Sequence, residues 1–163
     1  GYKLDVVSNE EILKRSILCD FISDLYFSKS TKFYEDEYRK GMLSDEISFD
    51  YEGSKTFFFF FLCASSTKVE GLKEDLLRYL QQIKNKDIDD ELFELVKKKK
   101  IGELIKRADS LNVSYRRIIE SLLNDYSIYQ DVEIIQNITK KHIKEFIQTL
   151  DENKQVISIL KQK

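Results

Sequence analysis

The sequence predicts an α+β fold in which a roughly four-stranded, mainly antiparallel sheet is covered by helices. Two observations lead to this class. Segments with alternating apolar residues lie near both ends and in the middle of the chain, and segments with helical spacing fill the rest. In addition, no Pro-rich, Ser-rich or Gly-rich linker divides the 163 residues. A chain of this length commonly forms one domain, so we expect a single unit over residues 1–163.

The first part of the chain predicts a strand followed by two helices. Residues 2–6 alternate and indicate a short strand. Ser8 is placed to cap a helix over about 9–27, whose apolar residues cover more than one face, as in a helix surrounded by other elements. A shorter helix over about 32–40 is expected to end at Gly41.

A β-hairpin is predicted in the middle of the chain. Residues 45–51 and 56–64 form its strands, and residues 52–55 form the turn. Five consecutive Phe residues occupy 57–61. Because alternate side chains of a strand point to opposite faces, we expect helices on both faces of this strand. The alternative is that one face lines an apolar groove or a partner interface.

The second half predicts helices and a final strand. Thr67 and Glu70 have capping-box spacing at the start of a helix that reaches about 84. Asp89 or Asp90 is expected to cap the next helix, where Gly102 suggests close packing against a neighbour. The remaining expected elements are helices over about 90–109, 114–124, 128–136 and 139–149, and a strand over 155–160.

Composition excludes several classes of function. The net charge is -2, from 27 basic and 29 acidic residues, and a nucleic-acid partner is not expected. No apolar run has the length of a membrane span. One His and two Cys cannot build a His/Cys zinc site, and the segment His142 to Phe146 has Phe where a zincin motif has its second His. Cys19 and Cys63 are expected to be small buried apolar residues.

The charged clusters favour structural roles. Lys97 to Lys100 would span about 300° around a helix and predict a solvated side rather than a phosphate site. The pairs Asp45/Glu46 and Asp89/Asp90 are explained by capping and helix dipoles. We therefore expect no autonomous active site, no catalytic residue and no metal ligand in this chain.

A family resemblance covers residues 25 to about 105. The residues that carry it are Leu25-Tyr26-Phe27-Ser28-Lys29-Ser30, Phe33-Tyr34, Tyr38, Gly41-Met42-Leu43, the hairpin, Thr67, and the segment from Asp89 to Glu103. In order and spacing this stretch resembles the second, non-zinc half of processing-peptidase-like members of the pitrilysin/insulinase family of zinc peptidases.

The resemblance implies a fragment of a larger protein in which two similar α+β halves clasp a chamber. Zinc is then expected only in the other half, and the implied partners are that N-terminal half, a second homologous subunit in some members, and peptide. A bacterial, cytoplasmic protein is expected. One departure matters: active members carry an Arg and a Tyr seven residues apart in this half, whereas Arg39 is followed by Glu46. This chain alone is not expected to be an enzyme, and the implied parent is a zinc metallopeptidase or an inactive homologue.

We predict that peptide adds to an edge strand at 45–51. Ser28, Ser30, Tyr34 and Arg39 are the candidate peptide-binding residues near its approach. The structural alternative is that the two serines cap a helix and the tyrosine packs. The alternative function is a helix-rich protein–protein interaction module without peptidase ancestry.

Overall fold

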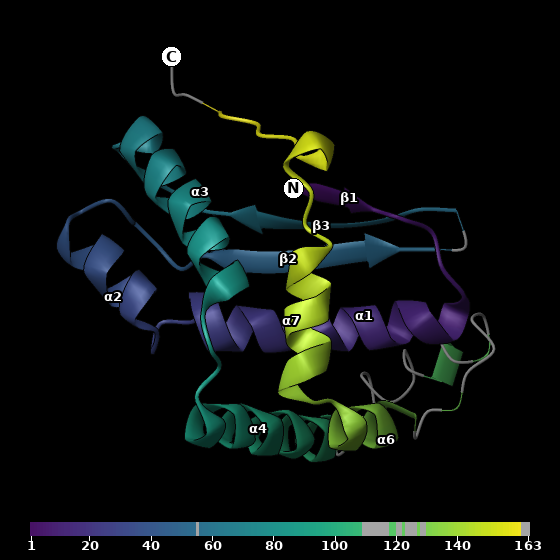
Figure 1. Ribbon diagram of the computed structural model, residues 1–163. Helices are drawn as coiled ribbons and strands as arrows, with labels where there is room; N and C mark the ends of the chain where they lie inside the picture. The colour runs from purple at the N-terminus through teal and green to yellow at the C-terminus, as the bar shows by residue number, and fades with distance from the viewer. Residues whose placement is uncertain (55, 109–117, 120–121, 123–126, 128–129, 161–163) are drawn as a thin grey trace.

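A computed structural model describes the chain except residues 55, 109–117, 120–121, 123–126, 128–129 and 161–163. The predicted helix over about 114–124 falls mostly on residues outside this description. The described elements confirm the α+β class (Figure 1). In chain order they are β1 (Tyr2–Leu4), α1 (Asn9–Ile22), the π-helical η1 (Ser23–Phe27), α2 (Lys32–Arg39), β2 (Ser48–Gly53), β3 (Phe58–Cys63), α3 (Val69–Asn85), α4 (Asp90–Ala108), α6 (Gln130–Asn137), α7 (Lys140–Gln148) and η2 (Glu152–Lys154).

The sheet has three antiparallel strands in the order β1-β3-β2. Phe60 of β3 lies opposite Tyr2 on one side and Tyr51 on the other. The Tyr2 and Phe60 rings stack with centroids 5.3 Å apart. This row faces the helices, since Phe60 also contacts Phe146 of α7.

The expected fourth strand is reduced to a single bridge, which corrects that part of the prediction. Gln155 pairs with Tyr2, and Val156 exchanges two backbone hydrogen bonds with Gly1, of 2.8 and 2.9 Å. In this antiparallel register the residues after Val156 lie beyond Gly1, and no described strand lies beside them there. Alternation in 155–160 predicts a strand, but a strand also needs a neighbour to supply the ladder.

α1 is the central helix, as its apolar residues on several faces predicted. It lies between the sheet and the pair α4 and α6, and α7 crosses it (Figure 1). The Ser8 hydroxyl accepts a hydrogen bond from the Glu11 amide, which confirms the predicted cap. The next turn, η1, widens to a π-helix and buries three consecutive side chains, Leu25, Tyr26 and Phe27.

The starts of α3 and α4 differ in how far they follow the prediction. Asp89 caps α4, with its carboxylate 2.9 Å from the Leu92 amide. The capping box at Thr67 is wrong, because α3 begins at Val69 and the residue in the cap position, Lys68, makes no side-chain cap bond.

The expected close packing at Gly102 is also wrong: a Cβ there would meet nothing within 4 Å among the described atoms. Nothing in the described structure explains this glycine.

The run of Phe residues has two different faces. Phe58 and Phe60 are 0% and 1% exposed in the core. On the opposite face Phe57, Phe59 and Phe61 contact one another, with neighbouring centroids 5.7 and 6.1 Å apart, and Phe57 is 37% exposed. The expectation of full cover on both faces is therefore wrong for the described part of the chain, and the partly open face corresponds to the alternative.

Candidate functional site

The two candidate serines lie in the turn between η1 and α2. The Ser28 hydroxyl donates to the Asp24 carbonyl oxygen at 2.9 Å and lies 3.0 Å from the Ser30 hydroxyl. Thr31, rather than either serine, caps α2, and its hydroxyl oxygen accepts from the Tyr34 amide at 3.3 Å. The turn is therefore held by its own hydrogen bonds, and Ser30 borders a cleft described below.

Tyr34 and Arg39 lie on α2 in different environments. Tyr34 is buried and stacks on Tyr38, with centroids 6.1 Å apart. The Arg39 side chain is 72% exposed and pairs with Glu35 at 2.5 Å. Arg39 and Ser30 are thus exposed, whereas Tyr34 packs, as the structural alternative proposed.

Strand β2 lies at one edge of the sheet, as expected, although it covers Ser48–Gly53 rather than 45–51. An ion pair between Lys29 and Glu46 joins the serine turn to the segment that leads into this strand. The Phe27 and Phe49 rings stack with centroids 5.8 Å apart and join the end of η1 to β2 itself. The candidate turn and the edge strand are therefore neighbours in space.

A cleft between η1, α2 and α3 holds a buried carboxylate. Glu37 is 2% exposed, and its Oε1 lies 2.6 Å from Lys40 Nζ, which also pairs with Asp75 at 3.3 Å. Glu37 Oε2 has no hydrogen-bond partner among the described atoms. Tyr79 lines the cleft and stacks on Phe33 at 4.1 Å, and burial raises its pKa to about 12. Lys40 therefore compensates the charge of Glu37, and Arg78 pairs with Asp75 at 2.9 Å. The tyrosine stays protonated at neutral pH.

The lysine run of α4 makes tertiary contacts, unlike the predicted solvated side. Lys97 extends over the Phe93 ring and donates to the carbonyl oxygens of Gln136 and Ile138 at 2.7 and 3.1 Å. Lys99 and Lys100 both pair with Asp24. Three of the four cations are thus directed at protein groups, which weakens any phosphate-binding interpretation.

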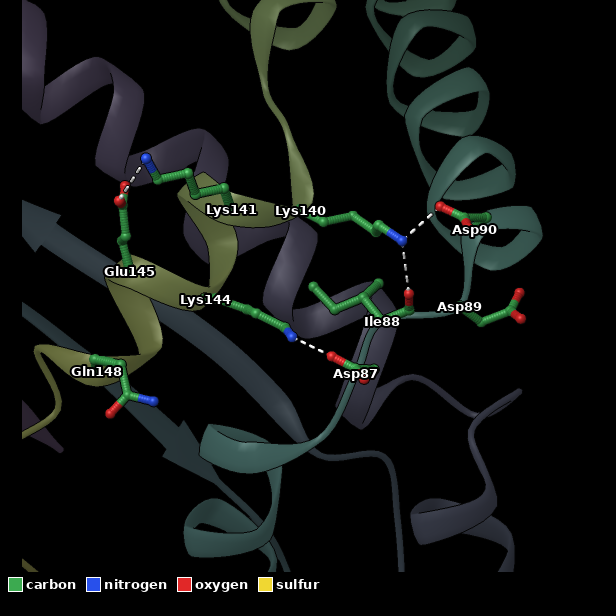
Figure 2. A pocket seen from close by; sticks show the side chains of 9 residues that line it. All are labelled: Asp87, Ile88, Asp89, Asp90, Lys140, Lys141, Lys144, Glu145 and Gln148. Atoms are coloured by element: carbon green, nitrogen blue, oxygen red, sulfur yellow. Dashed lines mark hydrogen bonds and ion pairs between the residues drawn. The ribbon is translucent and has the colours of Figure 1, made fainter.

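A second cleft lies between α7 and the loop from α3 to α4 (Figure 2). Its lysines reach across it: Lys140 pairs with Asp90 at 2.5 Å and also donates to the Ile88 carbonyl oxygen, and Lys144 pairs with Asp87 (Figure 2). These contacts join α7 to the loop and compensate the positive charges. The cleft therefore offers an anion no uncompensated cluster of lysines.

The described residues do not fit zinc. His142 Nδ1 accepts a hydrogen bond from the Thr139 amide in a capping box at the start of α7. Glu145 pairs with Lys141. Cys19 is buried and Cys63 is exposed, both as free thiols, so the expected burial is wrong for Cys63. Among the described residues, no group of three or more His, Cys, Asp or Glu side chains could hold a metal ion.

No family model matches the chain. It is 27% identical over 139 residues to the uncharacterized zinc protease YmfH of Bacillus subtilis, which covers 85% of this chain and 32% of that protein. An M16-like peptidase from Alicyclobacillus acidocaldarius superimposes with a TM-score of 0.82 at 18% identity, over 91% of this chain and 36% of that one. The resemblance to pitrilysin/insulinase peptidases is confirmed.

Two further solved structures share the fold. A protease from Helicobacter pylori has a TM-score of 0.72 at 12% identity, over 90% of this chain and 36% of that one. A zinc protease from Bordetella pertussis Tohama I has a TM-score of 0.71 at 10% identity, over 94% of this chain and 86% of that one. This peptidase-like chain thus spans about a third of the Bacillus protein and of the first two structures.

Some ion pairs of this peptidase-like chain were not among the predictions made from the sequence, although one of them has a local signal. The pair Glu37 and Lys40 has helical i,i+3 spacing, which is a signal the sequence does contain. The pairing of Asp24 with Lys99 and Lys100 joins distant segments and has no local signal.

No helix among the described residues combines the length and apolarity that a bilayer crossing needs.

Proposed function

We propose that this chain is the metal-free, C-terminal half of a zinc-peptidase-like protein, and that it helps to enclose and bind peptide without cleaving it. The similarity to a zinc protease about three times as long supports a part of a larger protein. Among the described residues, the missing ligand set supports a role other than metal chemistry. The expected partner is the N-terminal half of the same protein or a second homologous subunit.

Zinc, if the parent is active, would lie in the other half. There it would supply Lewis-acid activation of a water molecule. The residues of this chain would act through shape and hydrogen bonds alone. The bacterial source of the similar proteins supports a bacterial protein, and the cytoplasm is our proposed location.

The edge strand β2 is the proposed peptide-binding element. An extended peptide can add to such an edge through main-chain hydrogen bonds. Ser28 and Ser30 lie in the turn that Lys29 ties to Glu46 ahead of β2. Arg39, on the helix that follows this turn, would pair with acidic groups of the peptide, while the buried Tyr34 would support the helix from inside.

Hydrogen exchange tests this proposal. A tryptic digest of casein added to the purified chain should slow exchange of backbone amides within Ser48–Gly53. Arg39→Ala should weaken this protection, whereas Lys141→Ala, which removes an exposed cation from α7, should leave it unchanged. Protection that is absent from β2, or equal in the two variants, would argue against the proposed site.

A further inference from the structure

Helix α4 carries apolar side chains on the side that faces away from the core. With α6 it forms the layer farthest from the sheet (Figure 1). Because an α-helix turns about 100° per residue, Leu95 and Gly102 lie on the same outer side, about two turns apart. Leu95 and Ile105 are each 65% exposed, and Leu92 is 39% exposed. The opposite side carries the buried apolar residues, Phe93, Val96 and Leu104.

Gly102 leaves a gap in the middle of this outer face. Glycine inside a helix lowers stability relative to alanine, yet a Cβ at this position would meet no described atom within 4 Å. The described part of the chain therefore gives no steric reason for glycine. A second helix that crosses the outer face here would give one, because the distance between two helix axes depends on the side chains at the contact.

The outer face of α4 is complementary to a second copy of itself. In an antiparallel pair of α4 helices centred between Leu95 and Gly102, each Leu95 lies level with the partner's Gly102. The same register brings Leu92 level with the partner's Ile105. It also brings Glu91 level with the partner's Lys106. Each copy thus places a large side chain at the gap of the other, which is the geometry of a two-fold interface.

The charges on this face favour the antiparallel orientation. Glu91 and Lys106 are exposed, and neither forms an ion pair within the described part of the chain. A parallel pair would bring like charges together, since the acid lies at the start of the helix and the lysine near its end. The two copies of Lys98 approach each other at the centre, but each follows the exposed Glu94 at i,i+4 spacing, which compensates its charge.

We propose that a second copy of this chain docks on the outer face of α4, helix against helix and antiparallel, to form a two-fold dimer. A single pair of helices buries less than the about 1,600 Å² of a standard interface. The dimer should therefore be weak and become populated as the protein concentration approaches about 1 mM. This inference does not depend on the proposed peptide site, because α4 and β2 belong to different layers (Figure 1).

Charge reversal at the two ends of the face tests the proposal. Sedimentation velocity of the full chain from about 10 μM to 1 mM should show a shift from monomer toward dimer. Glu91→Lys and Lys106→Glu each place like charges at both ends of the pair, so each should weaken dimerisation about tenfold. An equimolar mixture of the two variants should associate again, because every end contact between the two different chains then joins opposite charges.

Gly102→Gln tests the gap itself. Glutamine forms helices better than glycine does, so a loss of the dimer would come from the added side chain, which takes the place of the partner's Leu95. Lys141→Gln, at an exposed position of α7, is the matched control and should leave dimerisation unchanged.

Three results would overturn the proposal. These are a wild-type chain that stays monomeric to about 1 mM, a mixture of the two charge variants that does not associate, and a Gly102→Gln chain that dimerises like wild type. None of them would alter the hydrogen exchange of β2, by which the proposed function is tested.

Discussion

Asp24 and Lys100 form an ion pair of 2.7 Å between Oδ2 and Nζ, in which each side chain is only 12% exposed. Lys99 Nζ lies 2.7 Å from the other carboxylate oxygen. The pair joins the π-helical turn η1 to α4, two segments that are distant in the sequence. It therefore fixes the start of the serine turn relative to the helical layer.

Lys100→Met should lower the free energy of unfolding by about 2 kcal/mol, because it leaves a largely buried carboxylate with one partner. Lys98→Met is the matched control on the same run. Lys98 is exposed, so its loss should change stability by less than about 0.5 kcal/mol. Urea unfolding measures both values, and equal effects would contradict the structural role of the pair.

The contribution of this pair should depend on pH. Burial raises the pKa of Asp24, but hydrogen bonds and charges from Lys100 and Lys99 outweigh it and hold the pKa below its usual 3.8. A carboxyl whose pKa is lowered on folding stabilises the protein above its unfolded pKa and loses that contribution as pH falls through the folded pKa. The stability difference between wild type and Asp24→Asn should therefore be constant near neutrality and shrink below about pH 4. A difference that grows in acid would contradict this assignment.

The two faces of β3 should differ in their tolerance of truncation. Phe60→Ala removes a ring that is 1% exposed and packs on Tyr2, Phe49 and Phe146, and should cost about 3–5 kcal/mol. Phe59→Ala, on the partly open face, should cost about 1 kcal/mol. Chemical denaturation of the two variants compares them directly. A larger cost at Phe59 would mean that the outer face is the better packed one.

The caps of α3 and α7 provide a second comparison. Thr139→Ala should destabilise the protein by about 1 kcal/mol, since the Thr139 hydroxyl accepts from the His142 amide. Thr67→Ala should have almost no effect, because α3 begins at Val69 without a side-chain cap bond. Thermal unfolding of both variants tests this. A comparable loss of stability in Thr67→Ala would mean that the capping box predicted from the sequence does form.

Two glycines should respond to alanine with opposite signs. Gly41 has φ +65° after α2, a conformation that costs other residues about 1 kcal/mol or more, so Gly41→Ala should destabilise. At Gly102 a Cβ would meet no described atom within 4 Å, so Gly102→Ala should stabilise α4 by about 1 kcal/mol. Denaturant midpoints give both signs. A loss of stability at Gly102 would show that its backbone conformation or a neighbour needs glycine.

Local chemistry in the sequence predicts those parts of the fold that depend on neighbours along the chain. Ser8, Gly41 and Asp89 mark helix ends where they were expected, because capping and left-handed backbone depend on a few adjacent residues. The central position of α1 also follows from its apolar pattern.

Features that depend on distant partners could not be predicted in the same way. The segment 155–160 alternates like a strand, yet its ladder is decided by what lies beside it. The partners of Lys99 and Lys100 belong to a turn that precedes the sheet. At the candidate site, the Lys29 to Glu46 ion pair places the serine turn beside the segment that leads into the edge strand, and no spacing in the sequence predicts this pair.

The central claim is that this chain contributes binding and enclosure to a peptidase-like protein, and no catalysis of its own. The most direct measurement is hydrolysis of a mixture of fluorogenic peptides by the purified chain, with added zinc and with a zinc chelator, against a mock preparation. The account predicts no hydrolysis above the mock level under either condition. Hydrolysis by the chain that requires zinc, or that survives the chelator, would contradict it.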